Sequence, residues 1–170
     1  MWGCMTAQEV GYACCIDGHM DSELYTNILG DEFLQSLEYY GMDVNKIIFQ
    51  QDHTAQKWFE DNGGVELLDW PAQSTDLNPI EHLWQHLKWQ LANYENDPVS
   101  IYELWKRVET EWNNIPPQIC LDLIASMPRR IDAFLKAKGG YTKYWIKNIF
   151  LFFIYRPQNW LNALIIFKNL

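Results

Sequence analysis

Residues 47–84 read IIFQQDHTAQKWFEDNGGVELLDWPAQSTDLNPIEHLW and contain four predicted elements in alternating order. The run 47–49 is β-branched and aromatic, which is typical of a buried strand. A helix is expected over 54–61, a second short strand over 65–68, and a longer helix from Asn78. Short apolar strands separated by helices indicate an α/β layer fold.

The rest of the chain extends this pattern in both directions. Upstream, the first five residues resemble the end of a strand, GYACCI at 11–16 reads as a second strand, and apolar residues at helical spacing predict one helix from Asp21 to Gly41. Downstream the sequence predicts only helices. They are expected over 78–93 and 100–113, and as two shorter helices opened by Pro116-Pro117 and Pro128.

Two of these helices begin with the same sequence signature. Asn78 is expected to cap its helix, with Pro79 at the first helical position and Glu81 at the third. Ser100 and Glu103 repeat this arrangement at the start of the next helix. Both pairs therefore predict capping boxes.

Asp52 and Glu81 are the candidate metal ligands. Asp52 ends a predicted strand, and Glu81 lies in the first turn of a predicted helix. Carboxylates at the edges of elements can hold the divalent cations of a phosphodiester-cleaving site. The alternative is local and structural: Asp52 would cap the following helix, and Glu81 would serve its capping box alone.

The bulk composition indicates one folded domain with an acidic surface. The chain has 170 residues, of which 48% are hydrophobic, so it is not disordered by composition. Its formal net charge of −9 argues against a basic clamp that grips nucleic acid alone. One compact basic cluster could contact a phosphate backbone or form a solvated helix face. It consists of Arg129, Arg130, Lys136 and Lys138.

Histidine, tryptophan and cysteine each leave alternatives open. His82 and His86 stand at i and i+4, yet no third metal ligand is evident, so surface or core positions are favoured. The cysteines form no CxxC pair and are expected to be reduced thiols of an intracellular protein without a signal peptide. Four tryptophans could stack on bases, but their helical spacing favours core packing. They are Trp84, Trp89, Trp105 and Trp112.

The last 26 residues, 145–170, differ in kind from the preceding part. They are aromatic and contain no Asp or Glu, and their longest apolar run, 149–155, is too short to span a bilayer. A membrane-surface role is one interpretation. The favoured one is a domain over 1–144 followed by a hydrophobic tail that is extraneous to it.

The segment WPAQSTDLNPIEHLW at 70–84 resembles the catalytic domain of Tc1/mariner-type transposases, which are DNA endonucleases of the DDE superfamily. The resemblance covers residues 1–144 and includes FQQD at 49–52. It implies an RNase H-like fold, a mixed sheet flanked by helices. It also implies that Asp52 and Glu81 hold the second and third acidic positions, that Mg²⁺ or Mn²⁺ is the cofactor, that DNA is the partner, and that the protein is nuclear.

Two departures from the family pattern predict an inactive fragment. The chain begins after the strand that carries the family's first catalytic Asp, so the fold is expected to be incomplete at its N-terminus, with a sheet edge that the tail could cover. Only 28 residues separate Asp52 from Glu81, fewer than in the family. The alternative function is a non-catalytic remnant that binds DNA weakly, an intact transposase or a second copy of itself. No small-molecule substrate is expected.

Overall fold

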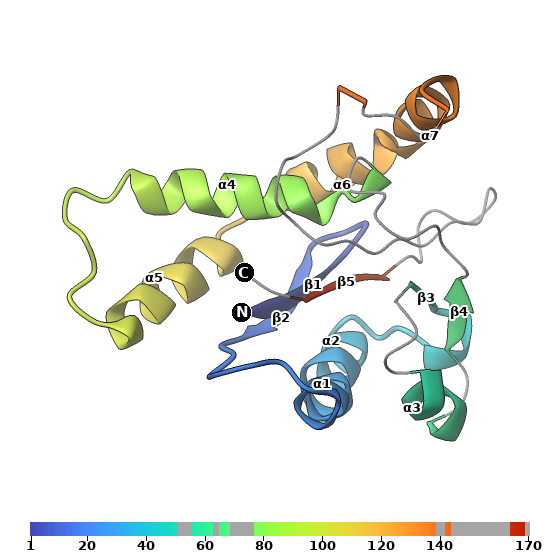
Figure 1. Ribbon diagram of the computed structural model, residues 1–170, viewed down its shortest axis with the longest axis horizontal. Coiled ribbons are helices and arrows are strands. Elements are labelled where there is room, and N and C mark those ends of the chain that lie inside the picture. The colour runs from blue at the N-terminus through green and yellow to red at the C-terminus, as the bar shows by residue number, and fades with distance from the viewer. Residues whose placement is uncertain (51–55, 63–64, 69–76, 139–141, 144–163, 169–170) are drawn as a thin grey trace.

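The computed structural model describes residues 1–50, 56–62, 65–68, 77–138, 142–143 and 164–168. Within these ranges two small sheets lie between groups of helices (Figure 1). The expected α/β fold is confirmed. Asp52, the expected second acidic ligand, falls outside the described residues.

The first sheet has the strand order β2-β1-β5. Strands β1 (Trp2–Thr6) and β2 (Val10–Cys14) form an antiparallel hairpin, in the part of the chain where the sequence predicts two short strands. Strand β5 (Leu164–Lys168) runs antiparallel along the other edge of β1, with Trp2 opposite Lys168 and Thr6 opposite Leu164. Both edges of β1 are therefore paired, and residues of the tail supply one of the two partners.

The second sheet joins β3 (Ile48–Gln50) to β4 (Glu66–Leu68) in parallel. Strand β5 also contacts β3, and it lies between β1 and β3 in Figure 1. The described strands thus combine antiparallel and parallel pairs, as expected of a mixed sheet.

The segment after β2 is helical without a break over 22–39, as expected, but a π-helical turn divides it into two α-helical parts. Helix α1 (Ser22–Ile28) begins at Asp21, whose carboxylate accepts a hydrogen bond from the Leu24 backbone N–H at 2.8 Å. A π-helical turn at Leu29–Phe33 then leads into α2 (Leu34–Tyr39). The apolar spacing does not reveal this wider turn. Leu29 and Phe33, at its two ends, are both fully buried.

The remaining helices match the predicted ones to within a few residues. Each starts near a signal in the sequence: Gln56 follows the first short strand, Ile101 follows the Ser100 cap, and prolines open the last two. A 3₁₀ turn, η2 (Val44–Lys46), precedes β3. The helices are α3 (Gln56–Asp61), α4 (Ile80–Ala92), α5 (Ile101–Asn113), α6 (Pro117–Ala125) and α7 (Met127–Lys136).

Strand β1 separates two apolar layers. Trp2 and Cys4 pack with the buried residues of α1 and α2, whereas Met5 packs with those of α4, α5 and α6. Alternate side chains of one strand point to opposite faces, so β1 is buried along its whole length. Helices α4 and α5 accordingly lie on one side of the first sheet and α1 and α2 on the other (Figure 1).

Aromatic contacts fix α4 and α5 against the hairpin. Trp84 of α4 stacks on Trp112 of α5 with ring centroids 4.9 Å apart, and the Trp112 indole N–H donates to the carbonyl of Gly11 at 2.8 Å. A Cβ at Gly3 would lie 3.1 Å from the Trp112 ring and 3.2 Å from the Trp84 ring. Glycine at position 3 therefore allows this close approach of strand and rings.

The structure describes the four cysteines and part of the tail. All four cysteines are free, as expected, with Cys4 and Cys120 buried. Residues 164–168 cover an edge of β1, which confirms the expected covering role for that part of the tail. The extraneous origin of 145–170 stays a prediction. No helix in the described ranges is long and apolar enough to cross a membrane.

Candidate metal centre

Glu81 lies in the first turn of α4, where its side chain is fully buried at 0% exposure. The apolar residues that follow it on the same helix, Leu83, Trp84 and Leu87, belong to the core beneath the hairpin. This packing draws the start of α4 into the interior. The carboxyl group is therefore removed from water by the position of its helix.

The hydrogen bonds around Glu81 use only one of its two carboxyl oxygens. The side-chain amide of Asn78 donates to Glu81 Oε1 at 3.2 Å, and Asn78 Oδ1 accepts from the Ile80 backbone N–H at 3.3 Å. Glu81 Oε2 is buried and has no hydrogen-bond partner among the described residues. A buried polar atom without a partner costs free energy, so a missing ligand is a natural explanation for it.

Burial also changes the acidity of Glu81. Removal from water raises the pKa of this carboxyl to about 8, and the charge of Lys88 opposes the shift only in part. Without a cation the group is therefore largely protonated at neutral pH. A divalent cation would displace that proton, because metal ligands bind in the deprotonated form. A carboxylate oxygen is the hard ligand that Mg²⁺ and Mn²⁺ prefer.

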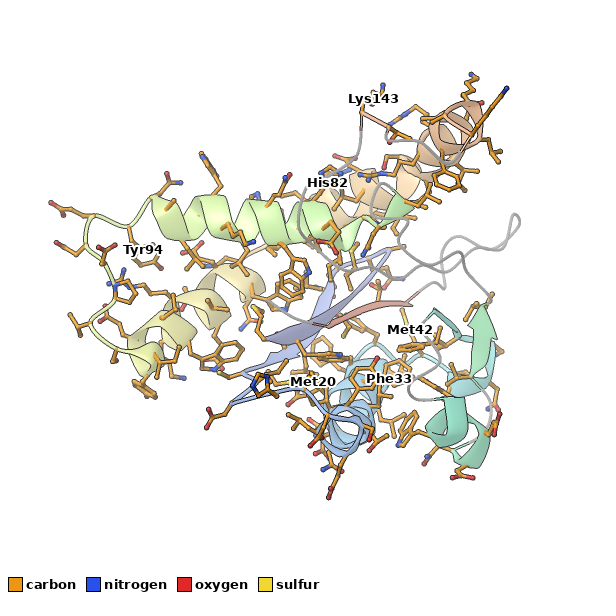
Figure 2. All side chains as sticks on the ribbon, in the orientation of Figure 1. Met20, Phe33, Met42, His82, Tyr94 and Lys143 are labelled. Carbon is orange, nitrogen blue, oxygen red and sulfur yellow. The ribbon has the colours of Figure 1, made fainter. Side chains whose placement is uncertain are left out.

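His82 lies beside this site, where the start of α4 meets α6 and α7 (Figure 2). Its Nε2 is buried without a partner in the described part of the chain. Burial, and secondarily the positive charge of Arg130, lowers the pKa of His82 to about 4. The imidazole is therefore neutral at physiological pH.

The described residues do not by themselves complete a metal centre. In the ranges given above, no three His, Cys, Asp or Glu side chains gather where they could hold an ion. The possible pair of His82 and His86 gains no third ligand there. The separation of Asp52 from Glu81 also lies outside what is described, so the paired-carboxylate site stays a prediction for Asp52.

The basic cluster expected on the last helix has one buried member and three exposed ones. Arg130 is only 2% exposed, and its Nε donates to Ser126 Oγ at 2.7 Å. Arg129 and Lys138 are exposed, and the Lys136 ammonium group pairs with Asp132 at 2.6 Å. Arg130 thus lies in the interior and does not share a surface with the other three. The nucleic-acid role of Arg129, Lys136 and Lys138 stays a prediction.

The four tryptophans also differ in their exposure to solvent. Trp84 and Trp112 are core residues, as their helical spacing indicates. Trp105 is half-buried, and Trp89 on the later part of α4 is 62% exposed, so the core interpretation is wrong for Trp89. Trp89 lies on the solvent face of α4, between Leu87 and Leu91, which both pack against the core.

Sequence reasoning did not identify the contact between Asn78 and Glu81. It assigned Asn78 to capping, and the structure gives its oxygen that task but its amide N–H₂ group to the carboxyl of Glu81. The signal in the sequence was the residue type. The asparagine side chain has a separate acceptor oxygen and donor N–H₂ group, so it can serve two partners at once, whereas aspartate only accepts and serine has a single polar atom.

Comparison with known proteins supports the resemblance found in the sequence. No protein-family model matches the chain. The Tc1 transposase of Caenorhabditis elegans is 38% identical over 152 residues, which cover 85% of the chain and 54% of that transposase. The Tcb1 transposase of Caenorhabditis briggsae is 35% identical over the same shares. The chain therefore spans about half the length of these curated relatives.

Solved structures agree on the fold. The Mos1 mariner paired-end complex with Mn matches with a TM-score of 0.70 and 18% identity, covering 82% of the chain and 43% of the Mos1 chain. The Mos1 transposase catalytic domain with raltegravir and Mg matches with a TM-score of 0.68 and 19% identity, covering 81% and 73%. The RNase H-like fold is thereby confirmed. By sequence, the chain is a homologue of the Tc1/mariner transposases over the part that it shares with them.

Proposed function

We propose that this chain is the metal-dependent endonuclease part of a Tc1/mariner-type transposase, with Asp52 and Glu81 as cation ligands. The observation that supports the proposal most strongly is the Glu81 carboxyl, which is fully buried with one oxygen unused. A capping glutamate would spend its carboxyl oxygens on backbone N–H groups, whereas a cation ligand needs a free oxygen.

The chemistry follows from the residues and the cofactor class. A bound divalent cation of this kind activates a water or a 3′-hydroxyl and stabilises the leaving oxygen of a phosphodiester. Glu81 would hold the cation through Oε2. The Mos1 catalytic domain has been solved with Mg and with Mn, which supports the same choice of ion here.

We propose further that the chain does not cleave DNA on its own. The 28 residues between Asp52 and Glu81 are fewer than the family pattern provides. Misplacing a ligand by about 1 Å can cost a hundredfold in rate, so a shortened connection weakens catalysis more than metal binding. Incubation with nicked or transposon-end DNA and Mg²⁺ or Mn²⁺ tests this. Cleavage that disappears in Asp52→Ala would show that the chain is active after all.

Metal binding is tested separately from cleavage. Titration with Mn²⁺, followed by the loss of the free-ion electron paramagnetic resonance signal, should show binding to the unaltered chain and weaker binding to Glu81→Gln and Asp52→Asn. Glu103→Gln is the matched control, because Glu103 occupies the corresponding position of α5 and is solvent-accessible. Equal Mn²⁺ affinity in all four proteins would contradict the proposed ligands.

DNA is the proposed partner, and the nucleus the proposed location. The paired-end complex of Mos1 supports a role at transposon ends. The net charge of −9 leads us to expect weak binding by the chain alone. A filter-binding titration across salt concentrations checks this: Arg129→Gln with Lys138→Gln should flatten the salt dependence, and an unchanged slope would remove these residues from the interface.

A further inference from the structure

We propose that Asn78 is a positioning residue for the cation site: its amide N–H₂ group holds Glu81 Oε1, which leaves Oε2 free for the ion. This inference rests on the proposed function and adds to it a residue that binds no metal itself. Asn78 and Glu81 are one helical turn apart and are both fully buried, so solvent does not compete for their contact.

The alternative role for Asn78 is that of a simple helix cap. In that case its oxygen would be the important atom and its amide would be incidental. The structure gives the amide a partner of its own, because Asn78 Nδ2 donates to Glu81 Oε1 at 3.2 Å while Oδ1 accepts from the Ile80 N–H at a similar 3.3 Å. The cap position itself is occupied by Pro79, which makes no side-chain cap hydrogen bond.

The hydrogen bonds of the Glu81 carboxyl also favour a positioning role for Asn78. In a capping box the glutamate accepts from a backbone N–H at the helix start. Glu81 Oε1 accepts from the Asn78 side chain instead, at 3.2 Å, and Glu81 Oε2 accepts nothing in the described part of the chain. A single donor on one oxygen fixes the rotation of the carboxyl plane while leaving the second oxygen available.

Such an arrangement has a measurable consequence for ion binding. Groups that orient a metal ligand typically contribute 10- to 100-fold to metal affinity, because an oriented ligand loses less freedom when the ion binds. Removing the amide donor should therefore weaken binding by roughly that factor. Loss of a helix cap alone would lower the melting temperature but leave the Mn²⁺ affinity of the folded protein unchanged.

The first experiment needs no metal. The side-chain N–H₂ resonances of Asn78 in the unaltered protein should exchange slowly with solvent, and their chemical shifts should move in Glu81→Gln. The side chain of Asn96, which is exposed, is the internal comparison. Asn78 resonances that exchange as fast as those of Asn96 would overturn the proposal whether or not the protein binds metal.

The second experiment compares Mn²⁺ affinity in Asn78→Ala, Asn78→Ser and Ser100→Ala. Asn78→Ser keeps a hydroxyl that can accept from the Ile80 N–H but replaces the two polar atoms of Asn78 with one on a shorter side chain, so it separates capping from positioning if Asn78→Ala fails to fold. Ser100→Ala removes the cap of α5 alone. We expect about a 10- to 100-fold loss for both Asn78 variants and none for Ser100→Ala.

The outcomes separate the two proposals. Mn²⁺ affinities of the Asn78 variants within twofold of the unaltered chain would overturn the positioning role while leaving Glu81 as a ligand. If the unaltered chain binds no Mn²⁺, the metal site itself is wrong, and with it the role of Asn78 in serving the ion. In that case protected Asn78 resonances would mark a structural contact only.

Discussion

Helices α4 and α5 begin with the same signature, yet their glutamates are in opposite states. Glu103 of α5 is accessible to solvent: its own backbone N–H donates to Ser100 Oγ at 3.1 Å, and its carboxylate accepts from the Val99 N–H at 2.8 Å. It also pairs with Arg107, one turn further on. Glu81 of α4 is fully buried, pairs with no basic side chain in the described part of the chain, and leaves one oxygen unused.

The acidities of the two groups diverge accordingly. Backbone and side-chain hydrogen bonds from Val99 and Arg107 lower the pKa of Glu103, whereas burial raises the pKa of Glu81 to about 8. The pattern of capping residue and glutamate therefore determines where a helix begins, but the surroundings of the helix determine what the glutamate does. The glutamate that is buried and has an oxygen without a hydrogen bond, Glu81, is the one with a candidate function.

Removal of the packing that buries α4 should have the largest effect. Trp84→Ala removes a ring that is 3% exposed and stacked on Trp112, so we expect a loss of about 3–5 kcal/mol in the free energy of unfolding, measured by chemical denaturation. Trp89→Ala, on the exposed part of the same helix, is the matched control and should change it little. Equal losses in the two variants would mean that the start of α4 is not held by the core.

The second largest effect is expected in the pH dependence of stability, which Glu81 should change. Its folded pKa of about 8 exceeds that of an unfolded glutamate, so the folded state holds the proton more tightly and loses stability as pH rises through this range. Between pH 6.5 and 8 we expect the unaltered chain, relative to Glu81→Gln, to lose about 2 kcal/mol without metal. Parallel stability profiles for the two proteins, measured in the presence of a chelator, would contradict the raised pKa.

The comparison with Glu81→Gln also cancels the contribution of His82, which the two proteins share. Burial lowers the pKa of His82 to about 4, so its neutral form stabilises the fold above the unfolded value near 6.5, and that contribution is lost as pH falls toward 4. Saturating Mn²⁺ should remove the difference that Glu81 makes near pH 8, because the ion replaces the proton. Glu103→Gln should show no such change in slope over the same interval.

The comparison also shows what the sequence could predict. Capping residues, prolines and apolar spacing located α4 and α5 closely, because those signals act within a few residues of the chain. The burial of Glu81, the exposure of Trp89 and the interior position of Arg130 depend on which parts of α4 and α7 meet the core. Likewise, the π-turn at Leu29–Phe33 and the pairing of β5 with β1 arise from contacts between distant segments.

Asn78 and Ser100, whose side-chain oxygens accept from the first turns of α4 and α5, provide a smaller and sharper contrast. Asn78→Ala removes the cap oxygen and leaves the buried Glu81 Oε1 without its donor, which costs about 1–3 kcal/mol in the free energy of unfolding. Ser100→Ala removes only an accessible cap, at a cost of about 1 kcal/mol. Denaturation at pH 6.5 measures both. A greater loss in Ser100→Ala than in Asn78→Ala would show that burial does not amplify the contact at α4.

The smallest effect is expected at Glu103 itself. Glu103→Gln removes the ion pair with Arg107, whose guanidinium also lies over the Tyr94 ring, 4.6 Å from its centroid, and bonds the Asn96 carbonyl. These further contacts should hold Arg107 in place at the far end of α4, where Tyr94 lies (Figure 2). Accessible ion pairs weaken with salt, so the melting temperatures of Glu103→Gln and the unaltered chain should converge as NaCl is raised. A difference in melting temperature that persists in high salt would mean that Glu103, like Glu81, is shielded from water. The contrast between the two helix starts would then rest on their hydrogen bonds alone.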